Sequence, residues 1–320
     1  MAAYKSDAEE LDALVQKYKD LKGEIHKVII GQDDVVDQVL ISIFSKGHCL
    51  LVGVPGLAKT LLVSTISDVL GLSFKRIQFT PDLMPSDIIG SEILDENRQF
   101  KFIKGPIFSN IILADEINRT PPKTQAALLE AMQEKNVTTA GIKHELDKPF
   151  FVLATQNPIE QEGTYPLPEA QLDRFMFNIW VDYPSIEDEI TIVKATTSNL
   201  EIEKKEIISG EEILYFQDLI RRMPVADNVI EYAVRLSNKT RNLETSPEIT
   251  KKYLSWGAGP RASQYLIIGA KAHAAINGKY SPDIENVKAV AEPILRHRIV
   301  RNYKAEAEGY SIERIIQELL

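Results

Sequence analysis

The segment from Gly53 to Thr60 has the residue types and the spacing that bind phosphate groups. Its sequence is Gly53-Val54-Pro55-Gly56-Leu57-Ala58-Lys59-Thr60, and Leu61 follows it. In such a loop, backbone N–H groups and the positive end of the next helix converge on phosphate oxygens, a lysine neutralises their charge, and a hydroxyl binds Mg²⁺. We therefore predict a nucleotide site formed by these nine residues, with Lys59 on the phosphates and Thr60 on the metal. The alternative is a strand-to-helix turn with an incidental lysine.

One position of this loop departs from the strict pattern. Ala58 stands where the pattern has a second glycine. Because a positive φ angle is unfavourable for alanine, we expect Ala58 to adopt an ordinary helical conformation.

Two adjacent carboxylates, Asp115 and Glu116, follow the apolar run Ile111-Ile112-Leu113-Ala114. The run predicts a buried strand, and parallel sheets bind ligands at the carboxyl ends of their strands. Beside a phosphate loop, Asp115 would orient Mg²⁺ and its water shell, and Glu116 would polarise the attacking water. The alternative is that both acids cap the following turn.

Four motifs occur in an order that resembles AAA+ ATPases of the MoxR family. Besides the phosphate loop, they are Leu113-Ala114-Asp115-Glu116-Ile117-Asn118-Arg119, Ala154-Thr155-Gln156-Asn157-Pro158 and Pro168-Glu169-Ala170-Gln171-Leu172-Asp173-Arg174-Phe175. As a set they are specific, and they span most of the chain. The resemblance implies an α/β P-loop NTPase fold, ATP hydrolysis, and ATP and Mg²⁺ as cofactors.

The resemblance also implies roles for three further polar side chains. Asn157 matches sensor 1, which helps to place the attacking water, although an asparagine before a proline also favours a turn. Arg174 matches the arginine finger, which reaches the γ-phosphate of a neighbouring subunit; the alternative is a surface salt bridge beside Asp173. Arg261 matches sensor 2, and whether it acts in its own subunit or on a neighbour stays open.

A short apolar segment precedes the helical pattern that begins at Gln32-Asp33. Its residues Ile29, Ile30 and Gly31 fall where the family packs the adenine ring. The alternative is a simple entry of the chain into the core.

Short apolar runs alternate with helical patterns through the first half of the chain, which predicts a parallel sheet between layers of helices. The predicted strands are 48–52, 74–79, 110–114, 150–154 and 178–181. Helical patterns cover 11–25, 35–43 and 59–70. Two inserted β-hairpins are predicted at 91–108 and 137–146, and neither is assigned a role.

From about residue 185 the strand pattern fades and helical patterns dominate. They cover 186–197, 211–222, 225–242, 261–276 and 281–298, with Ser281 as the expected N-cap and Pro282 at the first helical position. We predict an α/β domain over residues 1–184 and a smaller all-helical lid domain over 185–320, joined by a connector at 200–208.

The composition excludes several classes of protein. The 320 residues carry a net charge of −9, which disfavours nucleic acid and anionic membranes as partners.

Cys49 is the single cysteine, and we expect it to be buried in a reducing, cytoplasmic setting. No apolar leader or membrane span is expected, and the five histidines lack the spacing of a metal site. The basic stretch from Arg296 to Arg301 is interpreted as the exposed side of a terminal helix.

These observations, together with the resemblance, predict an Mg²⁺-dependent ATPase that remodels or matures protein complexes in a chaperone-like way. Kinship alone implies a ring of identical subunits, with six as the expected number, and clients that include von Willebrand factor A domain proteins. Two alternatives stay open, a nucleic-acid-stimulated motor of the helicase type and an ATP-gated scaffold without turnover.

Overall fold

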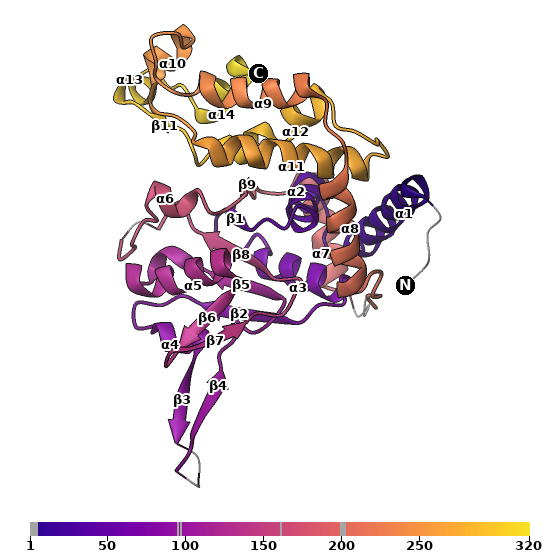
Figure 1. Cartoon of the computed structure of the whole chain (residues 1–320), viewed down its shortest axis with the longest axis vertical. Coiled ribbons are helices and arrows are strands. Elements are labelled where there is room, and N and C mark those ends of the chain that lie inside the picture. Colours follow the sequence, from indigo (N-terminus) through magenta and orange to yellow (C-terminus); the bar gives the residue numbers. More distant parts are fainter. Residues whose placement is uncertain (1–5, 95, 97, 161, 199–202) are drawn as a thin grey trace.

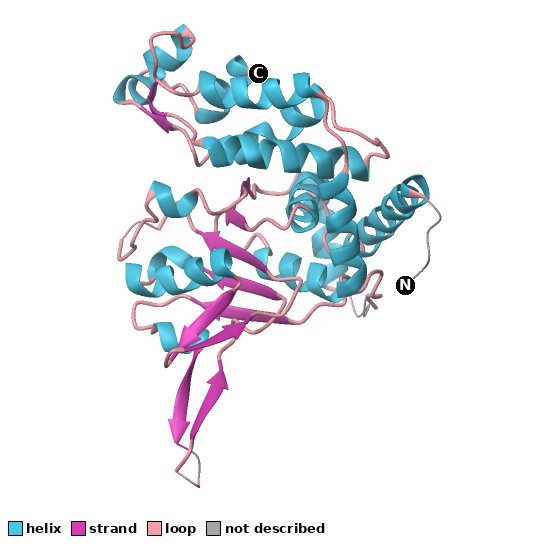
Figure 2. Cartoon of the chain, in the orientation of Figure 1, coloured by secondary structure: helices cyan, strands magenta, loops and turns pink. Residues whose placement is uncertain are grey.

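The computed structural model describes residues 6–94, 96, 98–160, 162–198 and 203–320. It consists of an α/β part and, above it in Figure 1, a helical part formed by residues 227–320. Figure 2 shows that the strands gather almost entirely in the α/β part. This arrangement confirms the predicted fold class.

A five-stranded parallel sheet forms the centre of the α/β part. Its spatial order is β2 (Phe74–Gln78), β5 (Ile111–Asp115), β8 (Phe151–Gln156), β1 (Cys49–Val52) and β9 (Phe177–Trp180). All five predicted strands are present, each within two residues of its expected bounds. Because the strands are parallel, their carboxyl ends lie at one edge of the sheet. The phosphate loop follows β1 there, Asp115 is the last residue of β5, and Asn157 directly follows β8.

Helices cover both faces of this sheet. They are α1 (Asp7–Ile25), α2 (Asp33–Phe44), α3 (Lys59–Val69), α4 (Pro85–Ile89), α5 (Pro122–Glu134) and α6 (Glu169–Leu172), with the 3-10 turn η1 (Ile117–Arg119) after β5. Alternate strand residues point to opposite faces. Leu51 and Leu113 therefore share a core with α1, α2 and α3, while Leu50 and Ile112 share another with α5.

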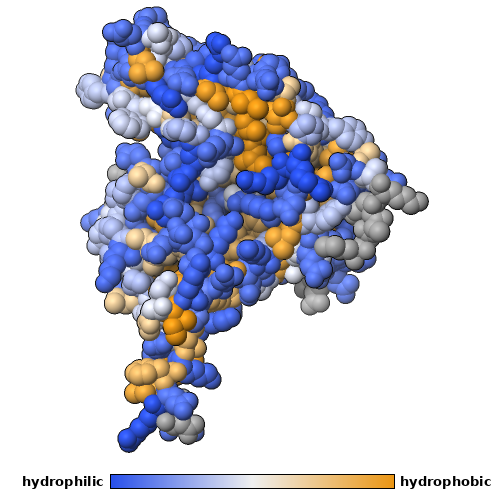
Figure 3. Space-filling model, in the orientation of Figure 1, coloured by the Kyte–Doolittle hydropathy of each residue, from blue (hydrophilic) through white to orange (hydrophobic). Residues whose placement is uncertain are grey.

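The predicted hairpins are both present, and the first projects far from the sheet (Figure 1). It pairs β3 (Gly90–Leu94) with β4 (Phe100–Lys104), and the second pairs β6 (Asn136–Thr139) with β7 (Ile142–Glu145). Gly90 has a φ of +96°, and a Cβ there would lie 2.1 Å from the Ile103 carbonyl oxygen, so the neck of the first hairpin requires glycine. Apolar side chains lie exposed along this hairpin in Figure 3; they include Leu94 and Phe100.

The second half of the chain is mainly helical. Its elements are α7 (Ile186–Thr196), α8 (Gly210–Arg222), α9 (Asp227–Lys239), α10 (Glu248–Tyr253), β10 (Leu254–Trp256), α11 (Pro260–Ile276), α12 (Ile284–Leu295), β11 (Val300–Arg301), α13 (Tyr303–Ala307) and α14 (Ile312–Leu319). The antiparallel pair β10–β11 was not predicted. Helix α8 packs on α1 and α2 as well as on α11, so the division at residue 184 stays a prediction. Residues 200–202 of the predicted connector lie outside the described residues.

The start of α12 differs from the prediction. Ser281 is not the N-cap; its hydroxyl donates to the carbonyl of Pro224 at 3.2 Å. The helix begins at Ile284 because Asp283 and Asn286 form a capping box, in which each side chain accepts a hydrogen bond from the other residue's backbone N–H.

The basic stretch after α12 also differs from the prediction. Arg296, His297 and Arg298 are not on an exposed helical side; they form the turn after α12 between the two parts of the molecule, where His297 and Arg298 are buried and the Arg296 side chain is 10% exposed. Their donors satisfy backbone carbonyls of the α/β part, which explains how charged side chains can be buried there. Cys49 is buried as expected, and burial raises the pKa of its thiol to about 12.

No described helix is long and apolar enough to cross a lipid bilayer.

Candidate functional site

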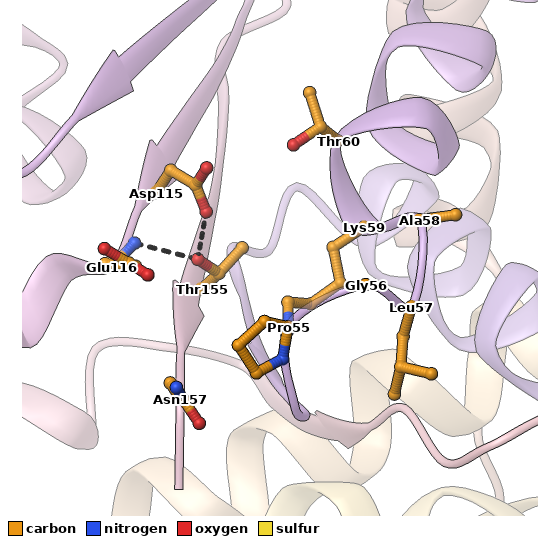
Figure 4. Close-up of a pocket in the computed structure, with 10 residues that line it drawn as sticks. All are labelled: Pro55, Gly56, Leu57, Ala58, Lys59, Thr60, Asp115, Glu116, Thr155 and Asn157. Atoms are coloured by element: carbon orange, nitrogen blue, oxygen red, sulfur yellow. Dashed lines mark hydrogen bonds between the residues drawn. The ribbon is translucent and has the colours of Figure 1, made fainter. Parts of the chain in front are cut away.

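A cavity of about 350 Å³ lies at the carboxyl edge of the sheet (Figure 4). Its lining comes from three stretches that are far apart in the sequence: the phosphate loop, the end of β5 and the end of β8. The lining residues are Pro55, Gly56, Leu57, Ala58, Lys59, Thr60, Asp115, Glu116, Thr155 and Asn157. The fold thus brings together the two motifs and the asparagine that the sequence singled out.

The backbone of the phosphate loop corrects one expectation. Ala58 has φ 54° and ψ 24°, which is the left-handed region rather than the expected helical conformation. Gly56, with a φ of +88°, is left-handed as well. The chain must reverse sharply between β1 and α3, and this reversal imposes a strain of about 1–2 kcal/mol on a residue with a Cβ. Ala58 therefore keeps the conformation that a glycine would adopt at this position.

The Lys59 side chain folds back over the loop. Its Nζ donates hydrogen bonds to the carbonyl oxygens of Gly53 at 2.5 Å and Val54 at 2.9 Å. Partial burial lowers the pKa of Lys59, and the nearby carboxylates of Asp115 and Glu116 oppose this shift. The cavity thus holds a lysine facing two acids, a charge arrangement suited to a polyphosphate bound with a cation.

Thr155 connects the two acids, a role that the sequence motifs did not predict. Its hydroxyl donates to Asp115 Oδ1 at 2.5 Å and accepts the backbone N–H of Glu116 at 2.8 Å, as the dashed lines in Figure 4 show. Thr155 is almost completely buried. The signal was present in the sequence, because a lone hydroxyl stands near the end of an apolar strand, one strand away from the acids.

Two side chains from β2 also contact the acids, and the motifs did not predict these either. Arg76 donates from Nε and Nη2 to Asp115 Oδ2 at 2.9 and 2.6 Å. Gln78 donates from Nε2 to Glu116 Oε2 at 3.0 Å. Residues two apart on a strand share a face, and β2 pairs with β5 so that Gln78 lies opposite Asp115. The alternation of Arg76 and Gln78 was visible, but which strand they neighbour was not.

Glu116 has a left-handed backbone, with φ 56° and ψ 50°. Its carboxylate accepts a hydrogen bond from Arg119 at 3.0 Å in addition to that from Gln78. Arg119 also forms an ion pair with Glu160 at 3.3 Å. Non-glycine residues in this region are strained and concentrate at functional sites. Gln78 and Arg119, which do not belong to the cavity lining, thus hold the Glu116 side chain on this strained backbone.

Asn157 is buried and lines the cavity. Its Oδ1 accepts the backbone N–H of Ile159 at 3.1 Å, so the residue also forms the predicted turn before Pro158.

The two predicted arginines do not line this cavity. Arg174 donates from Nη1 to the carbonyl of Leu129 on α5 at 2.6 Å. Arg261, at the start of α11, pairs with Asp173 at 3.0 Å. Asp173 also pairs with Arg298 at 2.8 Å, so its ion pairs with described residues run to these two arginines rather than to Arg174. Among the described residues, Arg174 thus bonds to a backbone carbonyl and forms no salt bridge with Asp173.

The predicted adenine segment also lies outside the lining. Ile29 is buried in the core beside α1–α3. Gly31 faces the first turn of α7, where a Cβ would lie 2.8 Å from Asp188 Oδ2. Gly53 and Val54 line an adjoining cavity of about 120 Å³, together with Trp180 and Tyr183. Leu61 is 44% exposed on α3.

Thr60 and Asp115 both line the main cavity and offer oxygen ligands of the kind that Mg²⁺ prefers. Within the described ranges, no group of three His, Cys, Asp or Glu side chains is placed to hold a metal. This donor set fits a magnesium ion that keeps several waters and shares phosphate oxygens, rather than a metal caged by protein alone.

Comparison with known proteins identifies the two parts of the chain. Residues 48–177 match the model for the ATPase family associated with various cellular activities (AAA), and residues 247–319 match the AAA lid domain. The structure resembles the crystal structure of a protein from Cytophaga hutchinsonii, with a TM-score of 0.91 and 45% identity, over 97% of this chain and 95% of the other.

Two curated relatives align over almost the whole chain. Chaperone MoxR1 of Mycobacterium tuberculosis is 44% identical over 98% of this chain and 83% of its own length. The uncharacterized protein YeaC of Bacillus subtilis is 41% identical over 92% of this chain and 91% of its own length. Together with the matched AAA and lid models, these relatives show that the chain belongs to the MoxR family of AAA+ ATPases.

Proposed function

We propose that this ATPase hydrolyses Mg·ATP within a ring of identical subunits and uses the reaction to remodel protein partners. The observation that carries the proposal is the single cavity in which Lys59 and Thr60 face Asp115, Glu116 and Asn157. A phosphate cradle, two acids and a polar amide are the groups that phosphoryl transfer to water requires.

Each side chain of the cavity has a proposed role. The loop N–H groups and Lys59 bind the phosphates, while Thr60 and Asp115 hold the metal. Bound Mg²⁺ would neutralise charge that develops on the phosphate oxygens. Glu116 orients the attacking water and accepts its proton, and Asn157 helps to position that water. Gln78 and Arg119 both donate to Oε2 of Glu116, which leaves Oε1 to accept the proton.

Arg174 is proposed to act on the nucleotide of a neighbouring subunit. Its absence from the cavity lining of its own chain supports this role. Arg261 bonds to Asp173, directly beside Arg174, which favours a role for it at the same neighbouring site. A ring, with six subunits as the expected number, gives every cavity such a neighbour.

The biological role is proposed from kinship. A relative named as a chaperone supports action on protein partners. We propose that these partners include von Willebrand factor A domain proteins and that the protein works in the cytoplasm.

Substitution of the two central residues tests the hydrolysis. Lys59→Ala should abolish ATP binding, because the charge on the phosphates is lost. Glu116→Gln should keep binding and lower kcat by about 10²–10⁴-fold, the usual contribution of a general base. Phosphate release and binding of a fluorescent ATP analogue measure the two effects, with magnesium omitted in a parallel series.

Matched controls exist for both variants. Lys271→Ala removes a partly buried lysine from α11, and Glu160→Gln removes another acid that contacts Arg119. Both should keep turnover. Full activity in Lys59→Ala or Glu116→Gln would contradict the proposal, and a wild-type protein that binds ATP without releasing phosphate would favour the scaffold alternative.

Mixing two inactive variants tests the neighbouring role of Arg174. Arg174→Ala subunits keep an intact cavity, and Glu116→Gln subunits keep an intact arginine. Mixed assemblies should therefore recover part of the hydrolysis, since one subunit completes the site of the next. If verified mixed assemblies stay inactive at every ratio, Arg174 does not act between subunits.

A further inference from the structure

The segment that carries Arg174 is bonded along its carbonyl side to the helical part. Residues 173–176 connect α6 to β9 and contribute four consecutive carbonyl oxygens. Arg298 donates to those of Asp173, Phe175 and Met176 at 2.9, 2.6 and 3.1 Å. Tyr265 of α11 donates its hydroxyl to the remaining one, that of Arg174, at 3.3 Å.

The N–H groups of the same segment bond to the α/β part instead. Those of Asp173, Arg174 and Phe175 donate to carbonyls of the α6 turn, and that of Met176 donates to the His48 carbonyl at 2.7 Å. The segment is thus shared between the two parts, with its donors used on one side and its acceptors on the other.

Arg298 provides the largest share of these contacts. Its side chain is 1% exposed, and its Nε also donates to the Asp173 carboxylate at 2.8 Å. The guanidinium lies over the Tyr265 ring, 5.0 Å from the ring centre. An unpaired buried carbonyl costs free energy. The hydrogen bonds from Arg298 therefore stabilise residues 173–176, which belong to no strand and whose carbonyls have no sheet-ladder partner among the described residues.

We infer that Arg298 is a positioning residue that fixes the Arg174 segment to the turn after α12, so that the helical part and Arg174 move as one unit. The inference rests on the proposed action of Arg174 on a neighbouring nucleotide. A movement of the helical part in one subunit is then transmitted to the site of the next subunit through residues 173–176.

Lysine at position 298 should loosen this unit without removing its charge. A lysine has donors on one nitrogen only, whereas the planar guanidinium places donors toward a carboxylate and several carbonyls at once. Arg298→Lys therefore loses geometry and keeps the positive charge beside Asp173.

Arg296→Lys is the matched control. Arg296 belongs to the same turn, is 10% exposed, and also reaches the α/β part, through the Asn178 carbonyl at 2.7 Å. Its other partners are Glu292, Glu313 and the ring of Trp180, and it does not bond to residues 173–176. The control removes a buried guanidinium between the parts and leaves the Arg174 segment bonded.

The mixing experiment tests the inference directly. The Glu116→Gln subunit serves as donor of Arg174, and the Arg174→Ala subunit supplies the active cavity. Adding Arg298→Lys to the donor should lower the recovered hydrolysis about tenfold or more, because a misplacement of about 1 Å can cost 10²-fold in rate. Adding Arg296→Lys to the donor should leave the recovery unchanged, as should adding Arg298→Lys to the Arg174→Ala subunit.

Hydrogen exchange gives a second measurement that does not depend on hydrolysis. In assembled Arg298→Lys protein, amides of residues 173–176 should exchange about tenfold faster than in the wild type, while amides of α3 should exchange at the wild-type rate. In the Arg296→Lys protein, the exchange of residues 173–176 should not change. Thermal unfolding and binding of the ATP analogue confirm that the variant is folded.

The outcomes separate the two proposals. If the Glu116→Gln/Arg298→Lys donor restores as much hydrolysis as the Glu116→Gln donor, the inference is overturned and the proposed function stands. Unchanged exchange at residues 173–176 would overturn it as well. Failure of the first mixture to recover would overturn the action of Arg174 between subunits, and with it the transmission proposed here.

Discussion

Two residues that border the cavity, Ala58 and Glu116, hold a backbone conformation that L-amino acids seldom adopt. Ala58 lets the phosphate loop reverse before α3, and Glu116 lets the chain leave β5 with its carboxylate beside Gln78 and Arg119. The residue types of both motifs pointed to the chemistry, but the alanine prediction was wrong about the conformation. Local preference favours a negative φ at alanine, and the closure of the loop overrides it.

Substitutions at Ala58 should reveal the strain. Ala58→Gly should raise the free energy of unfolding by about 0.5 kcal/mol, because relief of about 1–2 kcal/mol is partly offset by the greater entropy of the unfolded chain. Ala58→Val should lower it by about 1 kcal/mol or more, since a β-branched residue tolerates this region poorly. Chemical denaturation measures both, and a glycine variant less stable than the wild type would argue against strain at this position.

At the scale of elements, His48 joins three of them at the start of β1. Its Nδ1 accepts the backbone N–H of Val152 on β8 at 3.0 Å, and its Nε2 donates to the Met132 carbonyl on α5 at 3.3 Å. This pattern requires a neutral ring. Burial lowers the pKa of His48 from 6.5 to about 4, with a smaller contribution from the charge of Lys135.

The stability of the protein should therefore fall in mild acid. Between pH 6.5 and about 4 the unfolded chain binds a proton at His48 that the folded chain does not, so acidification favours unfolding. The loss should reach about 3 kcal/mol at pH 4, at 1.36 kcal/mol per pKa unit. Chemical denaturation between pH 6.5 and about 4 should show that the free energy of unfolding falls less in His48→Asn than in the wild type, by about that amount, whatever the stability of the variant at pH 7. Equal drops in both proteins would contradict this assignment.

Element prediction succeeded where the pattern was local. The apolar runs located all five strands of the sheet, and the turn residues located both hairpins. The start of α12 was missed because two candidate caps stand close together, and only the capping box of Asp283 with Asn286 decides between them. Short elements such as β10 and β11 were missed because they pair across 44 or more residues and carry little periodicity of their own.

At the scale of the whole molecule, the sequence alone determined the motifs, the α/β order of the elements and the family resemblance. These depend on residue type and on near-neighbour spacing, which a linear chain states directly. Only the tertiary structure decided which polar side chains surround the acids. It brought Arg76, Gln78 and Thr155 to Asp115 and Glu116 from strands 38–40 residues away. It also buried Arg298 against the Arg174 segment, because carbonyls left without strand partners need donors, and the turn after α12 is where the fold provides them.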